Sequence, residues 1–171
     1  SSDKNFFGLL GCLNQLAENY QYPIIVSTHP RTRKRLEQLN PRESAESGVS
    51  VFNLHPLIQW QKPMGFVDYN ALQKQAYAVL SDSGTISEES SILNFRALNI
   101  RQAHERPEAM EEASVMMVGL SPERILQGLE ILESQARGEE RQLRLVEDYS
   151  MPNVSDKVVR IIMSYTDYVN R

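Results

Sequence analysis

The sequence predicts an α/β protein with a Rossmann-like parallel sheet and helices on both faces of that sheet. Short runs of β-branched and apolar residues alternate along the chain with longer segments whose apolar residues recur at helical spacing. The short runs are mostly apolar, which is typical of parallel strands covered on both faces. With 171 residues, of which 41% are hydrophobic, the chain can bury one core without disulfides, so one domain is expected.

The first half of the chain opens with an amphipathic helix that Ser2 and Asp3 cap and that Pro23 stops. A run rich in Ile, Val and Thr at 24–28 then predicts a buried strand. The pattern next predicts a basic helix over 31–39, a strand near 49–54, and a long proline-containing loop through Trp60 and Gly65. Loops of that length usually carry function.

The second half continues the alternation without a break. Ser121 has the character of a helix cap, and Pro122 suits the first position of the helix after it. The predicted elements are a helix at 69–75, a strand at 77–80, a helix at 85–93, a strand at 97–100, a short helix at 107–112, a strand at 115–118, the helix from 122, and two final helical stretches. Ligands of such sheets bind beyond the carboxyl ends of the strands, so the turns that follow the strands are the candidate sites.

Composition excludes several classes of protein. The net charge of −4 and the pI of about 5.4 do not favour nucleic-acid binding. No apolar run is long enough for a membrane helix, and the polar start is not a secretory signal, so we expect no membrane contact. The single Cys12 cannot pair within the chain, which favours a reducing compartment, and we expect the cytoplasm.

The segment from Ser81 to Glu89 forms a candidate anion site between a strand and a helix. Backbone N–H groups at a helix N-terminus lack internal partners, and the helix dipole is positive there. Gly84 leaves room for a phosphate, Ser83 and Thr85 offer hydroxyls, and Glu89 can accept hydrogen bonds from ribose hydroxyls. An ordinary helix cap followed by first-turn glutamates explains the same residues, and physical chemistry alone favours that explanation.

Two further segments are rich in groups that bind anions. Arg101 and Arg106 flank His104 directly after a predicted strand, and guanidinium groups suit a phosphate or a sugar hydroxyl. A solvated loop with surface ion pairs is the alternative for that segment. His29 ends the strand at 24–28 and could donate a hydrogen bond to a substrate, or simply bond to its own backbone. The histidines match no zinc spacing, so we expect neither a metal nor a cofactor.

The sequence of residues 81–108 resembles that of a known protein family. SDSGTISEESSIL is followed by HERPEAMEEASVMMVGL, and the two segments together resemble the signature of the non-hydrolysing UDP-N-acetylglucosamine 2-epimerase family. The variant is most similar to the branch that makes UDP-N-acetyl-L-fucosamine for surface polysaccharides from a UDP-6-deoxy-L-talosamine derivative. The resemblance implies a glycosyltransferase-B-like fold of two domains, with residues 1–171 as the C-terminal, UDP-binding domain.

The resemblance also implies roles for individual residues. It places Ser83, Gly84 and Thr85 at the diphosphate, Glu89 at the ribose, and Arg106 at the phosphate or sugar end. The loop from Met64 to Tyr69 is expected beside the uracil, and His29 near the sugar or an effector pocket. Three positions depart from the family pattern: Thr85 replaces a common glycine, and Met64 and Tyr69 stand where other members have Gln and Phe.

The reaction that the resemblance implies needs more than these residues. It is proton removal from carbon 2 with loss of UDP, followed by addition to the opposite face of the resulting glycal. The family's acid/base residues lie on an N-terminal domain that this sequence lacks, so we expect the chain alone to be catalytically silent, with that domain, a UDP-sugar and a second copy in a homodimer as its partners. The alternatives are the donor-binding half of a glycosyltransferase and a non-catalytic α/β interaction module.

Overall fold

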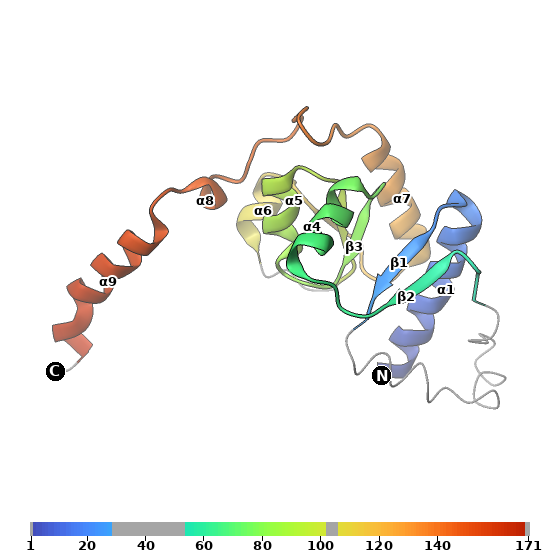
Figure 1. Ribbon diagram of the computed structural model, residues 1–171, viewed down its shortest axis with the longest axis horizontal. Helices are drawn as coiled ribbons and strands as arrows, with labels where there is room; N and C mark the ends of the chain where they lie inside the picture. Colours follow the sequence, from blue (N-terminus) through green and yellow to red (C-terminus); the bar gives the residue numbers. More distant parts are fainter. Residues whose placement is uncertain (1, 29–53, 102–105, 170–171) are drawn as a thin grey trace.

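The structure, a computed structural model, describes residues 2–28, 54–101 and 106–169 (Figure 1). Its elements alternate between helices and short strands, as the sequence predicts. In chain order they are α1 (Ser2–Tyr20), β1 (Ile24–Ser27), β2 (Ile58–Gln61), α4 (Phe66–Gln75), β3 (Val79–Ser81), α5 (Ile86–Leu93), β4 (Ala97–Asn99), α6 (Pro107–Glu111), β5 (Met116–Met117), α7 (Pro122–Glu133), α8 (Glu147–Ser150) and α9 (Val154–Val169).

Within the described part of the chain, all strand pairs are parallel. β1 pairs with β2, and β4 lies between β3 and β5 in a second ladder. In this second ladder Ser81 lies opposite Asn99, and Asn99 lies opposite Met117. The carboxyl ends of these three strands therefore meet at one edge of the sheet.

Helices cover both faces of β4, and the alternation of its side chains shows how. Leu98 is fully buried beneath α1 and α7, where it packs with Leu16 and Ile125. Ala97 points to the opposite face, where it packs with Ile86 of α5. Because neighbouring strand residues point to opposite faces, one short strand contributes to two apolar clusters. The predicted Rossmann-like arrangement of a parallel sheet between helices is confirmed.

The segment 54–65 corrects one prediction. It is not a continuous loop, because Ile58–Gln61 forms β2 alongside β1. Ile58 is buried while Gln59 and Gln61 are exposed, which is the period-two pattern of a strand with one solvated face. A search for runs of apolar residues misses such a strand. The predicted helix at 31–39 and all but Leu54 of the predicted strand near 49–54 lie outside the described residues.

Other boundaries shift by small amounts. α4 begins at Phe66 instead of 69, and β3 begins at Val79 instead of 77. The opening helix ends before Pro23 as predicted, with Gln21 in the left-handed region at φ 54°. Such shifts are expected, because helix ends fray and strand ends depend on their partners.

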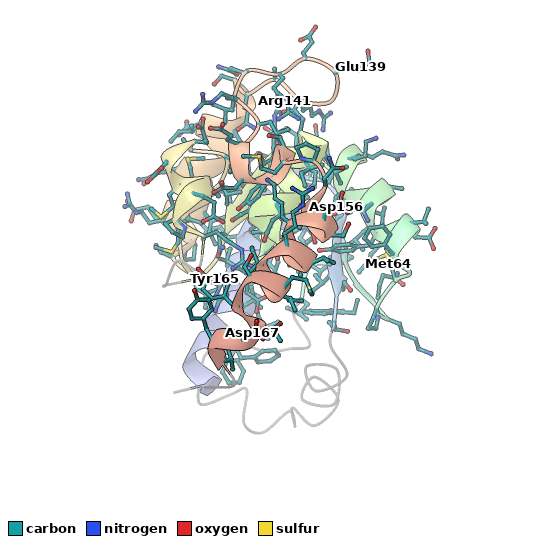
Figure 2. The ribbon with its side chains drawn as sticks, turned by 90° about the vertical axis from the view of Figure 1, so that its left-hand side faces the viewer. Met64, Glu139, Arg141, Asp156, Tyr165 and Asp167 are labelled. Atoms are coloured by element: carbon teal, nitrogen blue, oxygen red, sulfur yellow. The ribbon has the colours of Figure 1, made fainter. Side chains whose placement is uncertain are left out.

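The C-terminal helix stands apart from the body of the molecule. α9 extends away from the rest of the molecule in Figure 1, and Figure 2 shows it from another side, with Asp156, Tyr165 and Asp167 labelled along it. None of its residues is buried. Even so, it is amphipathic, and its exposed apolar residues are Val154, Val158, Val159, Ile161, Ile162, Met163, Tyr165, Tyr168 and Val169. Among the described residues, no helix is both long and apolar enough to cross a bilayer.

Candidate functional site

The candidate site lies at the edge where β3 and β4 end. The amide of Ile100 donates to the carbonyl oxygen of Ser81 at 3.0 Å, which holds the two strand ends together. The loop into α5 starts after Ser81, and the segment that leads to Arg106 starts after Ile100. Two segments that are separate in the sequence therefore leave the sheet side by side.

Hydroxyl groups organise the turn into α5. Ser83 Oγ and Thr85 Oγ1 lie 2.9 Å apart and share a hydrogen bond. The amide of Ser83 donates to Ser81 Oγ at 3.1 Å, and the amide of Thr85 donates to Ser83 Oγ at 3.3 Å. Thr85 is the N-cap residue of α5, yet its side chain makes no capping hydrogen bond. The hydroxyl of Thr85 is thus turned toward Ser83 in the loop, not toward the first turn of the helix.

One turn into the helix, Glu89 contacts α4. Gln73 Nε2 donates to Glu89 Oε2 at 2.6 Å, and Gln73 itself is buried. Tyr69 lies four residues before Gln73 and so on the same face of α4. Partial burial raises the pKa of Tyr69, and the charge of Glu89 raises it further, while a hydrogen bond with Gln73 opposes the rise. Gln73 therefore contacts Glu89, the candidate ribose contact, from the same face of α4 that carries Tyr69, the candidate base contact.

Arg106 is held by Glu88, the residue that precedes Glu89 in α5. Its Nε donates to Glu88 Oε1 at 2.7 Å, and the side chains are 38% and 28% exposed, respectively. The hydrogen bond and the charge of Glu88 raise the pKa of the Arg106 guanidinium. Adjacent glutamates of α5 thus contact different partners: Glu88 binds Arg106 at the start of α6, and Glu89 binds Gln73 of α4.

A second hydrogen bond fixes the short helix α6. Tyr149 of α8 donates from its hydroxyl to Glu108 Oε1 at 2.9 Å. Burial raises the pKa of Tyr149, and the hydrogen bond to Glu108 raises it further, so the phenol stays protonated and remains a donor. This contact secures the element that begins directly after Arg106.

The arrangement supplies the groups that a nucleoside diphosphate needs. A helix N-terminus, two hydroxyls and a guanidinium can bind phosphate oxygens, and a carboxylate can accept hydrogen bonds from ribose hydroxyls. In the described ranges, no group of three or more His, Cys, Asp or Glu side chains is placed to hold a metal ion.

Six of the seven predicted site residues fall in the described part of the chain. Ser83, Gly84 and Thr85 form the turn before α5, with Glu89 one turn further on, Tyr69 on α4, and Arg106 at the N-cap of α6. His29 lies outside the described residues, as does His104. No site role was predicted for Gln73 or Glu88. Gln73 lies four residues after Tyr69, a helical spacing that places both on one face and could have indicated a role for Gln73.

The sequence can now be compared with known families. The model of the family described as UDP-N-acetylglucosamine 2-epimerase matches residues 1–163. The chain belongs to this family. A curated family member from Methanocaldococcus jannaschii, a UDP-N-acetylglucosamine 2-epimerase, is 32% identical over 123 residues, which is 72% of this chain and 32% of the relative.

Solved structures of epimerases in this family agree with the fold. The UDP-N-acetylglucosamine 2-epimerase from Rickettsia bellii is 44% identical, with a TM-score of 0.84 over 98% of this chain and 43% of that one. The M. jannaschii UDP-GlcNAc 2-epimerase, solved in complex with UDP-GlcNAc and UDP, is 26% identical, with a TM-score of 0.75 over 95% of this chain and 41% of that one. These enzymes have the glycosyltransferase-B-like fold, so the predicted fold class is confirmed. The chain spans about a third of the length of the curated relative.

Proposed function

We propose that this chain is the UDP-binding half of a UDP-N-acetylhexosamine 2-epimerase. The observation that carries the proposal is the single sheet edge at which the turn 83–85, Glu89 and Arg106 come together. Membership of the 2-epimerase family supports it, and so does the M. jannaschii relative, whose structure holds UDP-GlcNAc and UDP. The substrate is UDP-N-acetylglucosamine or a UDP-6-deoxy-L-talosamine derivative that yields UDP-N-acetyl-L-fucosamine for surface polysaccharide.

In this proposal, Ser83, Gly84 and Thr85 bind the diphosphate at the N-terminus of α5, and Arg106 binds a phosphate or the sugar end. Glu89 accepts hydrogen bonds from the ribose, the segment from Met64 to Tyr69, which enters α4 at Phe66, lies beside the uracil, and His29 lies near the sugar or an effector pocket. Support comes from the chemistry of these groups, because donors and positive charge stabilise a diphosphate.

The proposed chemistry divides between two parts of an enzyme. A base removes the proton from carbon 2, the bond from carbon 1 to the diphosphate oxygen breaks, and its electron pair leaves with UDP. UDP then adds back to the glycal while a proton returns to carbon 2 on the opposite face. The groups at the start of α5 and Arg106 stabilise the leaving diphosphate. A further domain supplies the acid and base.

The proposed location rests on the single Cys12, which favours a reducing compartment, and the proposed assembly rests on the family resemblance. The enzyme acts in the cytoplasm and pairs with a second copy as a homodimer. Light scattering on an epimerase that contains this chain measures the second point directly. A monomer at micromolar concentration would contradict it.

Calorimetry with UDP tests the binding function. The 171-residue chain is expected to bind UDP, and ADP serves as the control for base selectivity. Binding should also slow hydrogen–deuterium exchange of the backbone amides in segments 81–89 and 101–108. Absence of both binding and protection would favour a non-catalytic interaction module.

An activity assay tests the division of labour. The chain alone, incubated with UDP-N-acetylglucosamine, is expected to produce no 2-epimer, because the proposed acid and base belong to another domain. Nuclear magnetic resonance of the sugar anomeric protons reads the outcome. Interconversion by the isolated chain would refute this part of the proposal.

A further inference from the structure

The amide of Gln73 is an unusual group to find beneath the candidate site. Gln73 lies on α4, is 3% exposed, and donates from Nε2 to Glu89 Oε2 at 2.6 Å. Its Oε1 is also buried and has no hydrogen-bond partner among the described residues. Because an uncompensated buried carbonyl oxygen destabilises a fold, this glutamine is not explained by packing.

The hydrogen bond from Gln73 limits how Glu89 can orient. A glutamate side chain on a helix has several rotatable bonds, so its carboxylate samples many directions. Holding Oε2 on a buried partner from another helix fixes the plane of the carboxylate, and thereby the direction in which Oε1 is presented. A protein group that is already held in its binding orientation loses less conformational entropy when the ligand binds.

We propose that Gln73 is a positioning residue for ribose recognition, acting through Glu89. This inference rests on the proposed function, which places Glu89 at the ribose hydroxyls. Tyr69 lies one turn before Gln73 on the same face of α4, and the proposed function places it at the base. One face of α4 thus joins the base end of the site to the ribose end, and the ligand class that it selects is a ribonucleoside diphosphate over a deoxyribonucleoside diphosphate.

The test compares UDP with 2′-deoxy-UDP and 3′-deoxy-UDP. Calorimetry on the 171-residue chain is expected to show that wild type binds UDP about tenfold more tightly than at least one deoxy analogue, as loss of a hydrogen bond to a charged group predicts. Gln73→Met keeps the length of the side chain and removes the donor. We expect it to reduce that ratio to about twofold or less, while affinity for the deoxy analogue stays within about twofold of wild type.

Two further variants complete the design. Gln75→Met makes the same change at an exposed position of α4 and should leave the ratio at its wild-type value. Gln73→Leu removes both polar atoms of the side chain and leaves an apolar residue of similar size, so it should also lose the preference for UDP over the deoxy analogues. Circular dichroism and the unfolding midpoint identify which variants are folded. One folded Gln73 variant is enough to test the inference.

The outcomes separate the inference from the proposed function. If wild type does not bind UDP, the proposed function fails, and the inference fails with it. If wild type binds and discriminates but a folded Gln73 variant keeps the ratio, or weakens UDP and deoxy analogues equally, the inference alone is overturned. Failure of both Gln73 variants to fold would assign Gln73 to the core and would also overturn the inference.

Discussion

At the scale of single residues, Arg106 has two contacts to reconcile. It donates to Glu88 Oε1 at 2.7 Å, and the proposed function also places it at a phosphate. The two roles are compatible, because a guanidinium has five N–H donors and Glu88 receives the one on Nε. The ion pair with Glu88 orients the guanidinium for the proposed phosphate contact.

Removal of Arg106 should weaken nucleotide binding. We expect Arg106→Ala to reduce UDP affinity by about 1–3 kcal/mol, the range for a hydrogen bond with a charged partner. The measurement is calorimetry with UDP. Arg144→Ala is the matched control, because Arg144 forms a comparable ion pair with Glu112 and its side chain is 72% exposed. Wild-type affinity in Arg106→Ala would count against the assignment of Arg106.

The pair of Glu112 and Arg144 predicts how stability responds to acid. The hydrogen bond from Arg144 holds the pKa of Glu112 below its ordinary value of 4.5. A carboxylate with a lowered pKa stabilises the folded state above its unfolded-state pKa, and this contribution is lost as the pH falls through the lower, folded-state value. The thermal midpoint of wild type should therefore fall more steeply below pH 4.5 than that of Arg144→Gln. Parallel profiles of the two proteins would show that the pair contributes nothing measurable, as many exposed pairs do.

The individual site residues were predictable to different degrees. Ser83, Gly84 and Glu89 stand together in one segment, so the sequence shows their shared location directly. Glu88 contacts Arg106, which lies 18 residues away in the chain, and Gln73 contacts Glu89, which lies 16 residues away. No local pattern specifies such contacts, because they depend on how α4, α5 and α6 pack.

At the scale of elements, α7 packs closely on β4 at Gly128. A Cβ atom at this position would lie 3.0 and 3.1 Å from the two Cδ atoms of Leu98 and 3.1 Å from Val118 Cγ1. Leu98 is fully buried and has little room to move. The glycine therefore sets how near the helix approaches the sheet.

Glycine replacements should have opposite effects on two helices. Gly128→Ala gains up to about 1 kcal/mol of helix propensity but overpacks the core at a cost of about 1–3 kcal/mol, so it should destabilise the fold. Gly8→Ala on α1 meets no atom within 4 Å and should stabilise by about 0.5–1 kcal/mol. Urea unfolding of both variants gives the comparison. A Gly128→Ala protein at least as stable as Gly8→Ala would contradict the packing argument.

Elements also differed in how well the sequence predicted them. The helices at 86–93 and 122–133 were confirmed, because each has an apolar face and a clear starting residue. β2 was missed because Ile58 and Trp60 alternate with glutamines, and the two prolines that flank the segment favour a loop. Its pairing with β1 is a tertiary contact that overrides this local signal.

At the scale of the whole molecule, α9 and the sheet differ in how they are held. α8 is attached to the body, since Val146 at its N-cap is 2% exposed and its amide donates to Ser91 Oγ at 3.1 Å. The residues of α9 bury nothing. Stability of the sheet should therefore depend on the chain as far as α8 and not on α9.

Two truncations test this dependence. A chain that ends at Asn153 lacks α9 and should keep the wild-type unfolding free energy within about 0.5 kcal/mol, together with its UDP affinity. A chain that ends at Arg144 also loses Val146 and the hydrogen bond from Tyr149 to Glu108, and should be destabilised by at least about 1 kcal/mol. Equal destabilisation by both truncations would show that α9 does contribute to the stability of the body.

The sequence by itself determined the α/β class, the order of most elements and the segment that contains Ser83, Gly84 and Glu89. Apolar periodicity and helix-start residues are local properties, and each can be read from a few neighbouring positions. Only the tertiary structure decided that β2 joins β1, that Glu88 holds Arg106, and that Gln73 holds Glu89. Those contacts arise because burial of apolar faces packs the helices against the sheet, and packing brings together side chains that no short-range pattern connects.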